Sequence, residues 1–435
     1  MFKNFLKDSL NFSFANIFIK GLNIILIPIY VRLLSFEDYG VLELITTLTI
    51  IFVVVVSLEL TQPILRFVAD SSDNEYEQAK YFNAGLQIIF FTSLIFILFC
   101  NMFAPQISYI LFKTNAYSQI IGVASLIISF QSINYTFSVI FRAEKKFNYA
   151  IRHSIVVALL AGAFALSFLI ISSGSLRSLL LGQAIGGFLA VLFGIFTLRD
   201  RLLYTHNFDI AKKMLFFSIP LVFSGVALHL STFADRIIVN EILSLEALAI
   251  YGIAAKAASI ITILISGIGA TLSPHFISTW NSSAGLNNLT KIFFIYILIS
   301  IFLVIFLIIF GEYIILFLGT SAAIGGKKVL LILASASIIN GLNIFLFGLL
   351  KAMKTSTLGL IYFSTAVLNI YLNYLFIIKY GIEGAAFATL ISSSIGFLMH
   401  FYLSSRYIKL PFSALIPFCF IITILIFNTF IVYYL

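Results

Sequence analysis

A lysine near the middle of the first apolar span is the residue best placed to act on a charged substrate. Lys20 lies about nine residues into a span with a rise of ~1.5 Å per residue, so it is roughly 14 Å deep, near the bilayer midplane. A central charge costs roughly 2.5 to 3.5 kcal/mol, so such residues usually face a wet cavity or a partner. Asn16, Lys20 and Asn23 are spaced to share one helix face. We predict that this polar stripe lines a transport cavity. The alternative is that Lys20 snorkels to the interface or pairs with another helix, although its depth makes snorkelling awkward.

The second half of the sequence contains further charged residues inside or beside apolar spans. Lys256 is about ten residues into its span, and the argument made for Lys20 predicts that it too faces a cavity. His229 lies in the middle of a span, where a histidine is often structural. An internal repeat with an offset of 209 residues, however, pairs His229 with Lys20. Asp235 and Arg236 are adjacent near the outer end of a span. They form either a local structural pair or part of the transport site.

Another polar stripe is predicted where the second span reaches the cytoplasm. Glu59, Gln62 and Arg66 follow helical spacing there. They form either a cytoplasmic vestibule for a diphosphate headgroup or a solvated helix edge.

Amide side chains recur at helical spacing within three other spans. The spacing places the members of each group on one face of their helix. Hydrogen bonds between helices explain such amides well, and the alternative is that some of them bind sugar hydroxyls. These polar groups are Gln131, Asn134 and Ser138; Asn340 and Asn343; and Asn369 and Asn373.

The composition is that of a polytopic membrane protein. Of 435 residues, 61% are hydrophobic and 10% are charged, and the mean hydropathy is +1.11, whereas soluble domains carry about 25% charged residues. The longest loops, about 61–80 and 101–118, are too short for a separate catalytic domain. We therefore predict an all-α protein that is not an enzyme. The thirteen segments apolar and long enough to span a bilayer are 11–34, 39–60, 81–103, 119–141, 150–173, 176–198, 215–238, 246–270, 290–310, 328–350, 357–379, 384–404 and 412–434.

Lys and Arg are distributed unevenly between the two sides of the membrane. With the N-terminus in the cytoplasm, seventeen of the 26 Lys and Arg residues fall inside and seven outside, with Lys20 and Lys256 within spans. This bias predicts a cytoplasmic N-terminus, with loops inside after each even-numbered span. The net charge of +9 therefore reflects topology. No exposed domain is predicted that would bind nucleic acid.

Motifs for other chemistry are missing from the sequence. Gly325-Gly326-Lys327-Lys328 lacks the hydroxyl residue of a phosphate-binding loop, so we expect no ATP hydrolysis and no cofactor. The five histidines are scattered without metal-ligand spacing, and the two cysteines, Cys100 and Cys419, lie in apolar segments. We predict no metal site, no catalytic residue and no disulfide framework.

The sequence contains an internal repeat with a constant offset of 209 residues. Each matching pair is weak alone, but a shared offset indicates a duplicated unit. An even number of spans in each half predicts two six-helix lobes, 1–200 and 207–405, related by a pseudo-twofold axis along the membrane normal, with an additional span in 406–435. The pairs are Leu34-Ser35-x-Glu37 with Leu243-Ser244-x-Glu246, Arg142-Ala143-x-Lys145 with Lys351-Ala352-x-Lys354, Lys20 with His229, and Arg66-Phe67 with His275-Phe276.

Three segments of the chain resemble signatures of a known transporter family. They are Pro28-x3-Arg32-x-Leu34-Ser35-x-Glu37-x-Tyr39-Gly40, Phe141-Arg142-Ala143-Glu144-Lys145-Lys146-Phe147, and Asp235-Arg236 followed by Tyr251-Gly252. Along its whole length the chain is similar to polysaccharide repeat-unit (O-antigen type) flippases of the multidrug/oligosaccharidyl-lipid/polysaccharide exporter superfamily. These motifs are loose and indicate the superfamily better than the substrate.

The resemblance implies a transport function. Such a flippase has twelve to fourteen spans and moves an undecaprenyl-diphosphate-linked oligosaccharide from the cytoplasmic to the outer leaflet of the bacterial inner membrane by alternating access, with its cavity between the lobes. The oligosaccharide is used for O-antigen, capsule or exopolysaccharide. The implied partners are membrane lipid, H+ or Na+ as a coupling ion, and a polysaccharide polymerase with its assembly proteins.

Other functions remain alternatives to this one. A peptidoglycan-precursor flippase and a multidrug antiporter belong to the same superfamily. An amphiphilic cationic drug would favour carboxylates in the cavity, whereas the deepest charges here are Lys20 and Lys256. A membrane polymerase or glycosyltransferase would need a sizeable extramembrane loop with acidic or Arg-rich groups, which this sequence lacks.

Overall fold

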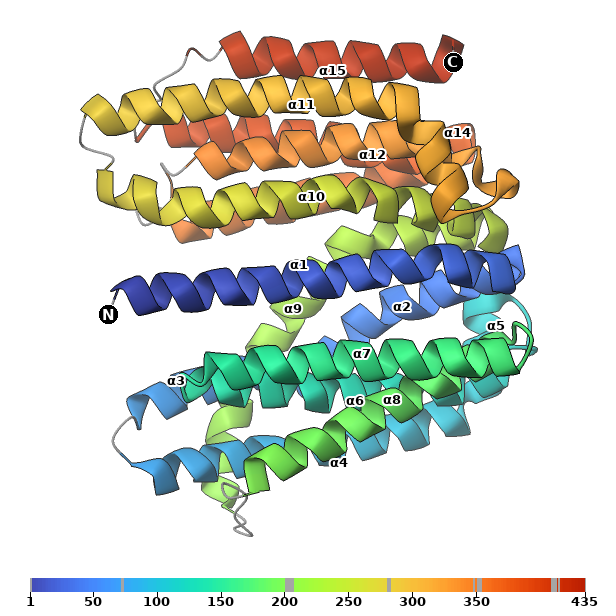
Figure 1. Ribbon diagram of the computed structural model, residues 1–435, viewed down its shortest axis with the longest axis vertical. Helices are drawn as coiled ribbons and strands as arrows, with labels where there is room; N and C mark the ends of the chain where they lie inside the picture. The colour runs from blue at the N-terminus through green and yellow to red at the C-terminus, as the bar shows by residue number, and fades with distance from the viewer. Residues whose placement is uncertain are drawn as a thin grey trace. The chain divides into compact units, whose positions relative to one another are not determined.

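Helices joined by turns are the only regular structure in the described part of the chain (Figure 1). The structure is a computed structural model that describes residues 2–71, 74–199, 207–279, 283–346, 349, 354–407, 413 and 415–434. Contacts divide the chain into two compact units, Met1–Leu230 and Ser231–Leu435, which we call unit 1 and unit 2.

Unit 1 is built from helices α1 to α8 and the first part of α9. The helices α7 and α8 pack against each other, α1 packs on α7, and α6 contacts α2, α4 and α8 (Figure 1). The bounds are α1 (Phe2–Leu33), α2 (Phe36–Ser57), α3 (Thr61–Asp70), α4 (Glu75–Met102), α5 (Ala104–Phe112), α6 (Ser118–Ala143), α7 (Phe147–Ile171), α8 (Leu176–Leu198) and α9 (Phe208–Ile242).

Unit 2 contains the second part of α9 and the remaining helices. Here α12 is central, because it packs against α10, α11, α14 and α15. The bounds are α10 (Leu245–Thr279), α11 (Ser283–Leu318), η2 (Ser321–Ala323), α12 (Gly326–Gly341), η3 (Leu342–Phe345), α14 (Thr355–Ser405) and α15 (Leu415–Tyr434).

Each predicted span overlaps a helix of the described chain, and the predicted all-α, polytopic architecture is confirmed. Ten helices of the described residues are long and apolar enough to cross a membrane, and Leu415–Phe430 is a shorter apolar helix. The two predicted spans 357–379 and 384–404 are joined in α14 at Gly381, which has a φ of 61° and interrupts the helical backbone. The symmetry relating the lobes and their bounds at 1–200, 207–405 and 406–435 stay predictions.

Two segments expected to be loops contain short helices. These are α3, in the predicted loop 61–80, and α5, in the predicted loop 101–118. On α3, Ile64, Phe67 and Val68 are buried while Gln62 and Arg66 are exposed. A ten-residue helix with only one apolar face is too short and too polar to be found by a search for spanning segments.

Equivalent serines cap the second helix of each half of the chain. Ser35 Oγ accepts a hydrogen bond from the backbone N–H of Asp38 at 3.0 Å, and Ser244 Oγ accepts one from Ala247 at 3.1 Å. Each serine satisfies a backbone donor that the first turn of a helix leaves unpaired. The helix bounds keep the same 209-residue offset: α1 and α9 end at Leu33 and Ile242, and α2 and α10 begin at Phe36 and Leu245.

The two halves differ at the far end of these capped helices. In unit 1 the chain leaves α2 through Leu58 and Glu59, both at a left-handed φ of 49°, before α3 begins. In unit 2, α10 continues without interruption through the equivalent stretch. A non-glycine residue in a left-handed conformation costs on the order of 1–3 kcal/mol, so surrounding packing must hold this break in place.

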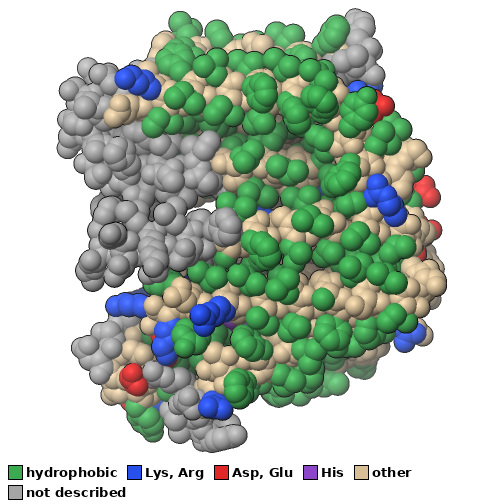
Figure 2. Space-filling model, viewed as in Figure 1, with side chains coloured by type: hydrophobic (Ala, Val, Ile, Leu, Met, Phe, Trp, Pro, Cys, Tyr) green, Lys and Arg blue, Asp and Glu red, His purple; other side chains and the backbone are tan. Residues whose placement is uncertain are grey.

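Large apolar side chains are exposed on the helix surfaces (Figure 2). On α4 alone, Phe90, Phe91 and Leu98 are each more than 60% exposed. A water-soluble surface does not carry apolar patches of this extent, whereas a lipid-facing surface does. The exposed helix faces therefore agree with a multi-pass membrane protein.

The helices α7 and α8 approach each other closely at two glycines. A Cβ on Gly182 would lie 2.3 Å from the carbonyl oxygen of Phe164, and one on Gly186 would lie 2.4 Å from that of Leu160. Four-residue spacing places both glycines on one face of α8. Small residues at this spacing let membrane helices touch backbone to backbone.

We expect Gly182→Ala and Gly186→Ala each to force α8 away from α7. The added methyl group would overpack the contact and cost about 1–3 kcal/mol, lowering the midpoint of thermal unfolding in detergent. Gly187→Ala is the matched control, because its Cβ would meet the Cβ of Phe130 at an ordinary 3.4 Å. Equal midpoints for all three variants would contradict the close packing.

Candidate functional site

The predicted site residues are divided between the two units. Unit 1 holds Lys20, Asn23, Glu59, Gln62, Arg66 and His229, and unit 2 holds Asp235, Arg236 and Lys256.

The polar stripe on α1 is exposed where its side chains are described. Lys20 and Asn23, three residues apart, are both exposed, whereas Ile27 and Tyr30 farther along the helix are buried. The side chain of Asn16 lies outside the described residues. The exposed ammonium and amide can both bind a polar ligand. That they line a cavity stays a prediction.

The end of α1 beyond this stripe is held firmly. Pro28 has no N–H to donate within the helix, and the Arg32 Nη1 donates to the Pro28 carbonyl oxygen at 2.8 Å. The α7–α8 turn packs against the last residue of α1, since a Cβ on Gly174, which has a φ of 99°, would lie 2.2 Å from the Leu33 carbonyl oxygen. The helix that carries Lys20 is thus anchored at this end.

Glu59 packs against α9 and not on the exposed surface beside Arg66. A Cβ on Gly225 would lie 2.7 Å from Glu59 Oε1 and 2.9 Å from Val54 Cγ1. Thr61 Oγ1 donates to Glu59 Oε2 at 3.3 Å. His229, one helical turn after Gly225, is half-buried. The contact of Glu59 with α9 therefore stabilises the break in the helix between α2 and α3.

In unit 2, Asp235 and Arg236 form a polar cluster with Tyr251 of α10. The Tyr251 hydroxyl donates to Asp235 Oδ2 at 2.5 Å, and the backbone N–H of Arg236 donates to Oδ1 at 2.8 Å. Arg236 Nη1 lies 3.8 Å from Oδ1, and its Cζ lies 4.9 Å from the ring centroid of Phe233. Both carboxylate oxygens are used, and the cluster ties α9 to α10. This geometry fits the local structural pair considered from the sequence.

Lys256 is half-buried on α10. Its neighbours Ala257 and Ala258 are buried, and Ser259 Oγ donates to the Lys256 carbonyl oxygen at 2.6 Å. An ammonium on an apolar helix is a point charge suited to binding an anionic group.

Three of the predicted amides form hydrogen bonds between helices or between the two limbs of α14. This confirms the structural explanation for these residues, because each amide nitrogen is already used within its unit. The bonds run from Asn134 Nδ2 to the Gly187 carbonyl oxygen at 2.9 Å, from Asn340 Nδ2 to Ser393 Oγ at 3.0 Å, and from Asn369 Nδ2 to Ser392 Oγ at 3.1 Å.

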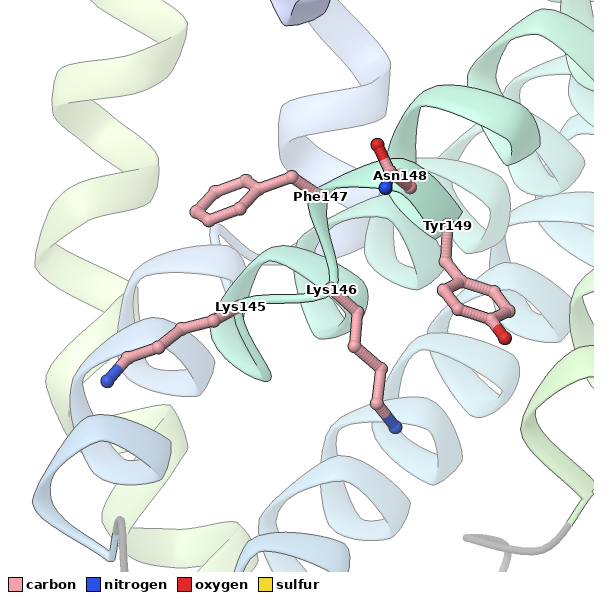
Figure 3. A pocket seen from close by; sticks show the side chains of 5 residues that line it. All are labelled: Lys145, Lys146, Phe147, Asn148 and Tyr149. Carbon is pink, nitrogen blue, oxygen red and sulfur yellow. The ribbon is translucent and has the colours of Figure 1, made fainter. Parts of the chain in front are cut away.

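The connection between α6 and α7 forms a shallow polar hollow of about 180 Å³ (Figure 3). Lys145 is in a left-handed conformation, with a φ of 59°, and the Lys146 N–H donates to the Phe141 carbonyl oxygen at 2.8 Å, which ends α6. Lys146 Nζ lies 2.7 Å from the carboxylate of Glu144, whose side chain is only 3% exposed. Figure 3 shows Lys145 and Lys146 pointing apart. Glu144 therefore pairs with Lys146 and not with Lys145. The hollow is lined by Lys145, Lys146, Phe147, Asn148 and Tyr149.

The sequence alone did not reveal a group of cations and aromatic rings in unit 1. Arg66 and Phe67 of α3, Tyr81 of α4, and Lys213 and Phe217 of α9 lie together. We call these five residues the cation–aromatic cluster. Only the Arg66-Phe67 and Lys213-x3-Phe217 spacings hinted locally at such stacking, and nothing in the sequence connects the two.

Among the residues that the structure describes, no three His, Cys, Asp or Glu side chains lie close enough to hold a metal ion. Cys100 is buried and Cys419 is exposed, and both are free thiols.

Solved structures with a similar fold are membrane transporters. A MATE family multidrug resistance transporter of the MOP superfamily, in an inward-facing conformation, has a TM-score of 0.73 at 13% identity, covering 89% of this chain and 95% of its own. The lipid II flippase MurJ has a TM-score of 0.70 at 18% identity, covering 97% and 98%. A MOP superfamily transporter from Pyrococcus furiosus, described as having a binding pocket of reverse polarity, has a TM-score of 0.59 at 14% identity, covering 92% and 95%.

Two family profiles match the sequence. The MatE profile matches residues 220–375, and the polysaccharide biosynthesis protein profile matches residues 5–280, more than half of the chain. No curated protein matches the sequence significantly. The chain thus belongs to the polysaccharide biosynthesis protein family and has the multi-pass membrane transporter fold of the MOP superfamily.

Proposed function

We propose that this protein is a flippase that moves an undecaprenyl-diphosphate-linked oligosaccharide from the cytoplasmic to the outer leaflet by alternating access. The observation that carries the proposal is the match of residues 5–280 to the polysaccharide biosynthesis protein family. The likeness of the fold to a lipid II flippase supports it. The product would feed the synthesis of O-antigen, capsule or exopolysaccharide.

The positions of the cations suit a substrate with a diphosphate. Lys20 is exposed on an apolar helix and Lys256 is half-buried on another, and an ammonium in such a place can neutralise phosphoryl oxygens. The polyprenyl tail would remain in lipid while the cavity takes the headgroup and sugars. The other proposed cavity residues are Asn16, Asn23, His229, Asp235 and Arg236, and the vestibule residues are Glu59, Gln62 and Arg66.

A multidrug antiporter is the second candidate. The MatE match over residues 220–375 and the likeness to a MATE transporter favour it. A cavity for amphiphilic cations would be expected to carry carboxylates, and the clearest buried carboxylate at the proposed site, Asp235, is already engaged by Tyr251 and Arg236. A MOP superfamily transporter of similar fold is described as having a binding pocket of reverse polarity that suggests a different function.

The proposed location is the bacterial inner membrane with a cytoplasmic N-terminus. The proposed partners are membrane lipid, H+ or Na+ as the coupling ion, and a polysaccharide polymerase with its assembly proteins. The Lys and Arg bias between the two sides supports this orientation.

The orientation predicts opposite accessibility for two exposed loops. In a variant lacking Cys100 and Cys419, a cysteine at Lys145 is expected to be protected from a membrane-impermeant thiol reagent in intact cells. A cysteine at Gly325, which is exposed and open on all sides, is expected to be labelled. Labelling of the first cysteine with protection of the second would reverse the orientation.

Removing charge at Lys20 or Lys256 is expected to reduce export strongly. A charge-assisted hydrogen bond contributes about 1.5–3 kcal/mol, so Lys20→Gln or Lys256→Gln should lower transport roughly tenfold or more, while Lys20→Arg keeps part of it. The measurement is surface polysaccharide divided by the amount of membrane-inserted transporter.

Lys379→Gln serves as the control for that experiment, because Lys379 is an exposed cation stacked on Tyr380. Its normalised export should stay at the wild-type value. A lysine needed only for folding would reduce the inserted protein and leave export per molecule unchanged. Normal export per molecule in both neutral variants would exclude a diphosphate cavity built on these lysines.

A further inference from the structure

The cation–aromatic cluster places two cations on one aromatic ring. Lys213 Nζ lies 4.5 Å from the Phe67 ring centroid, and Arg66 Cζ lies 6.0 Å from the same centroid and 5.0 Å from that of Phe217. Phe67 also stacks on Tyr81, with centroids 5.3 Å apart, and contacts Phe217 at 5.9 Å. Both cations therefore lie against the same group of aromatic rings, and cation–π attraction holds the two cations in position.

The three helices that carry the cluster are fixed by core contacts one turn away. A Cβ on Gly85 of α4 would lie 3.0 Å from Ile64 of α3 and 3.4 Å from Met214 of α9. Ile64 and Met214 are fully buried. The cluster is thus built on a packed junction of α3, α4 and α9, and its geometry does not depend on loops.

The charges of Arg66 and Lys213 are not balanced by carboxylates of the described chain. Both side chains are exposed, and their interactions are those with the aromatic rings. By contrast, the neighbouring Lys80 is paired with Glu77 at 2.6 Å. Two like charges on one ring repel each other, and an anion lying between them would be attracted by both.

The length of α2 places the cluster at the membrane surface. Its 22 residues span about 33 Å, close to the ~30 Å thickness of the hydrocarbon core. The break at Leu58 and Glu59 follows directly, so α3 begins where the span ends. Figure 2 shows Lys and Arg side chains gathered at one end of the helices of unit 1, in the lower left of the view.

We propose that the cation–aromatic cluster is a docking site for the diphosphate headgroup of the lipid-linked substrate, occupied before the headgroup reaches Lys20. This inference rests on the proposed function. The planar guanidinium of Arg66 binds two oxygens of one phosphoryl group, and the ammonium of Lys213 binds an oxygen of the other phosphoryl group. The apolar rings beneath shield the pair on one side, and the surface position allows a lipid to enter with its tail in the bilayer.

The test is binding to the full-length protein in phosphatidylcholine nanodiscs. The probes are a short polyprenyl diphosphate, inorganic diphosphate and phosphatidylglycerol, and the variants are Arg66→Gln, Lys213→Gln and the two combined. We expect the double variant to bind both diphosphate probes about tenfold more weakly than wild type. Lys80→Gln is the matched control, and its affinity should stay within about twofold because Glu77 already neutralises Lys80.

Three binding outcomes would overturn the docking site. One is equal diphosphate affinity in the wild type and the double variant, and another is phosphatidylglycerol binding as tight as that of polyprenyl diphosphate, which would indicate a general anionic-lipid surface. Loss of polyprenyl diphosphate binding with unchanged inorganic diphosphate binding would also contradict the proposed headgroup chemistry. Tm values matching wild type confirm that the variants are folded.

Export assays separate this inference from the proposed function. If Lys20→Gln abolishes export while the double variant exports normally at limiting substrate, the docking site is wrong and the flippase function stands. If export is normal in every variant, both the docking site and the diphosphate cavity built on Lys20 and Lys256 are excluded. The proposed function is then decided separately, by whether lipid-linked sugars accumulate in a strain that lacks the protein.

Discussion

The structure depends on one constraint, that a polar group within hydrocarbon must find its partner inside the protein. Asp235 meets it through Tyr251 and the backbone of Arg236, and the amide nitrogen of Asn134 meets it through a backbone carbonyl of α8. Such bonds are made because an unpaired polar group in lipid is costly. Against this background an exposed lysine on an apolar helix, such as Lys20, stands out. We propose that a ligand or water satisfies its charge.

The repeat explains why the halves share helix bounds, and the differences between them show where unit 1 is specialised. Ser35 and Ser244 cap equivalent helices. Only unit 1 breaks its helix near Glu59, and that break creates the amphipathic helix α3 with Arg66 on its exposed face. Among the described residues of unit 2, α10 continues through the equivalent stretch without such a break.

The spanning helices were predictable because a bilayer demands about 20 apolar residues in each of them. The serine caps were predictable because serine at a helix start has a local physical role, whereas the lobe symmetry inferred from the repeat stays a prediction. The short helix α3 was missed because half of its surface is polar. The pairing of Arg66 with Lys213 was also missed, since it depends on how α3 and α9 pack and leaves no local pattern. The contact of Glu59 with Gly225 of α9 was also not predictable, because it depends on how α2 and α9 pack.

The central claim is that the substrate is a lipid-linked oligosaccharide. The most direct measurement is mass spectrometry of polyprenyl-diphosphate-linked sugars in a strain lacking this protein, with the leaflet of each species assigned by enzymatic access from outside. The account predicts that a complete repeat unit accumulates in the cytoplasmic leaflet and declines when the wild-type chain is restored. An unchanged pool of lipid-linked sugars, together with altered efflux of amphiphilic cations, would contradict it.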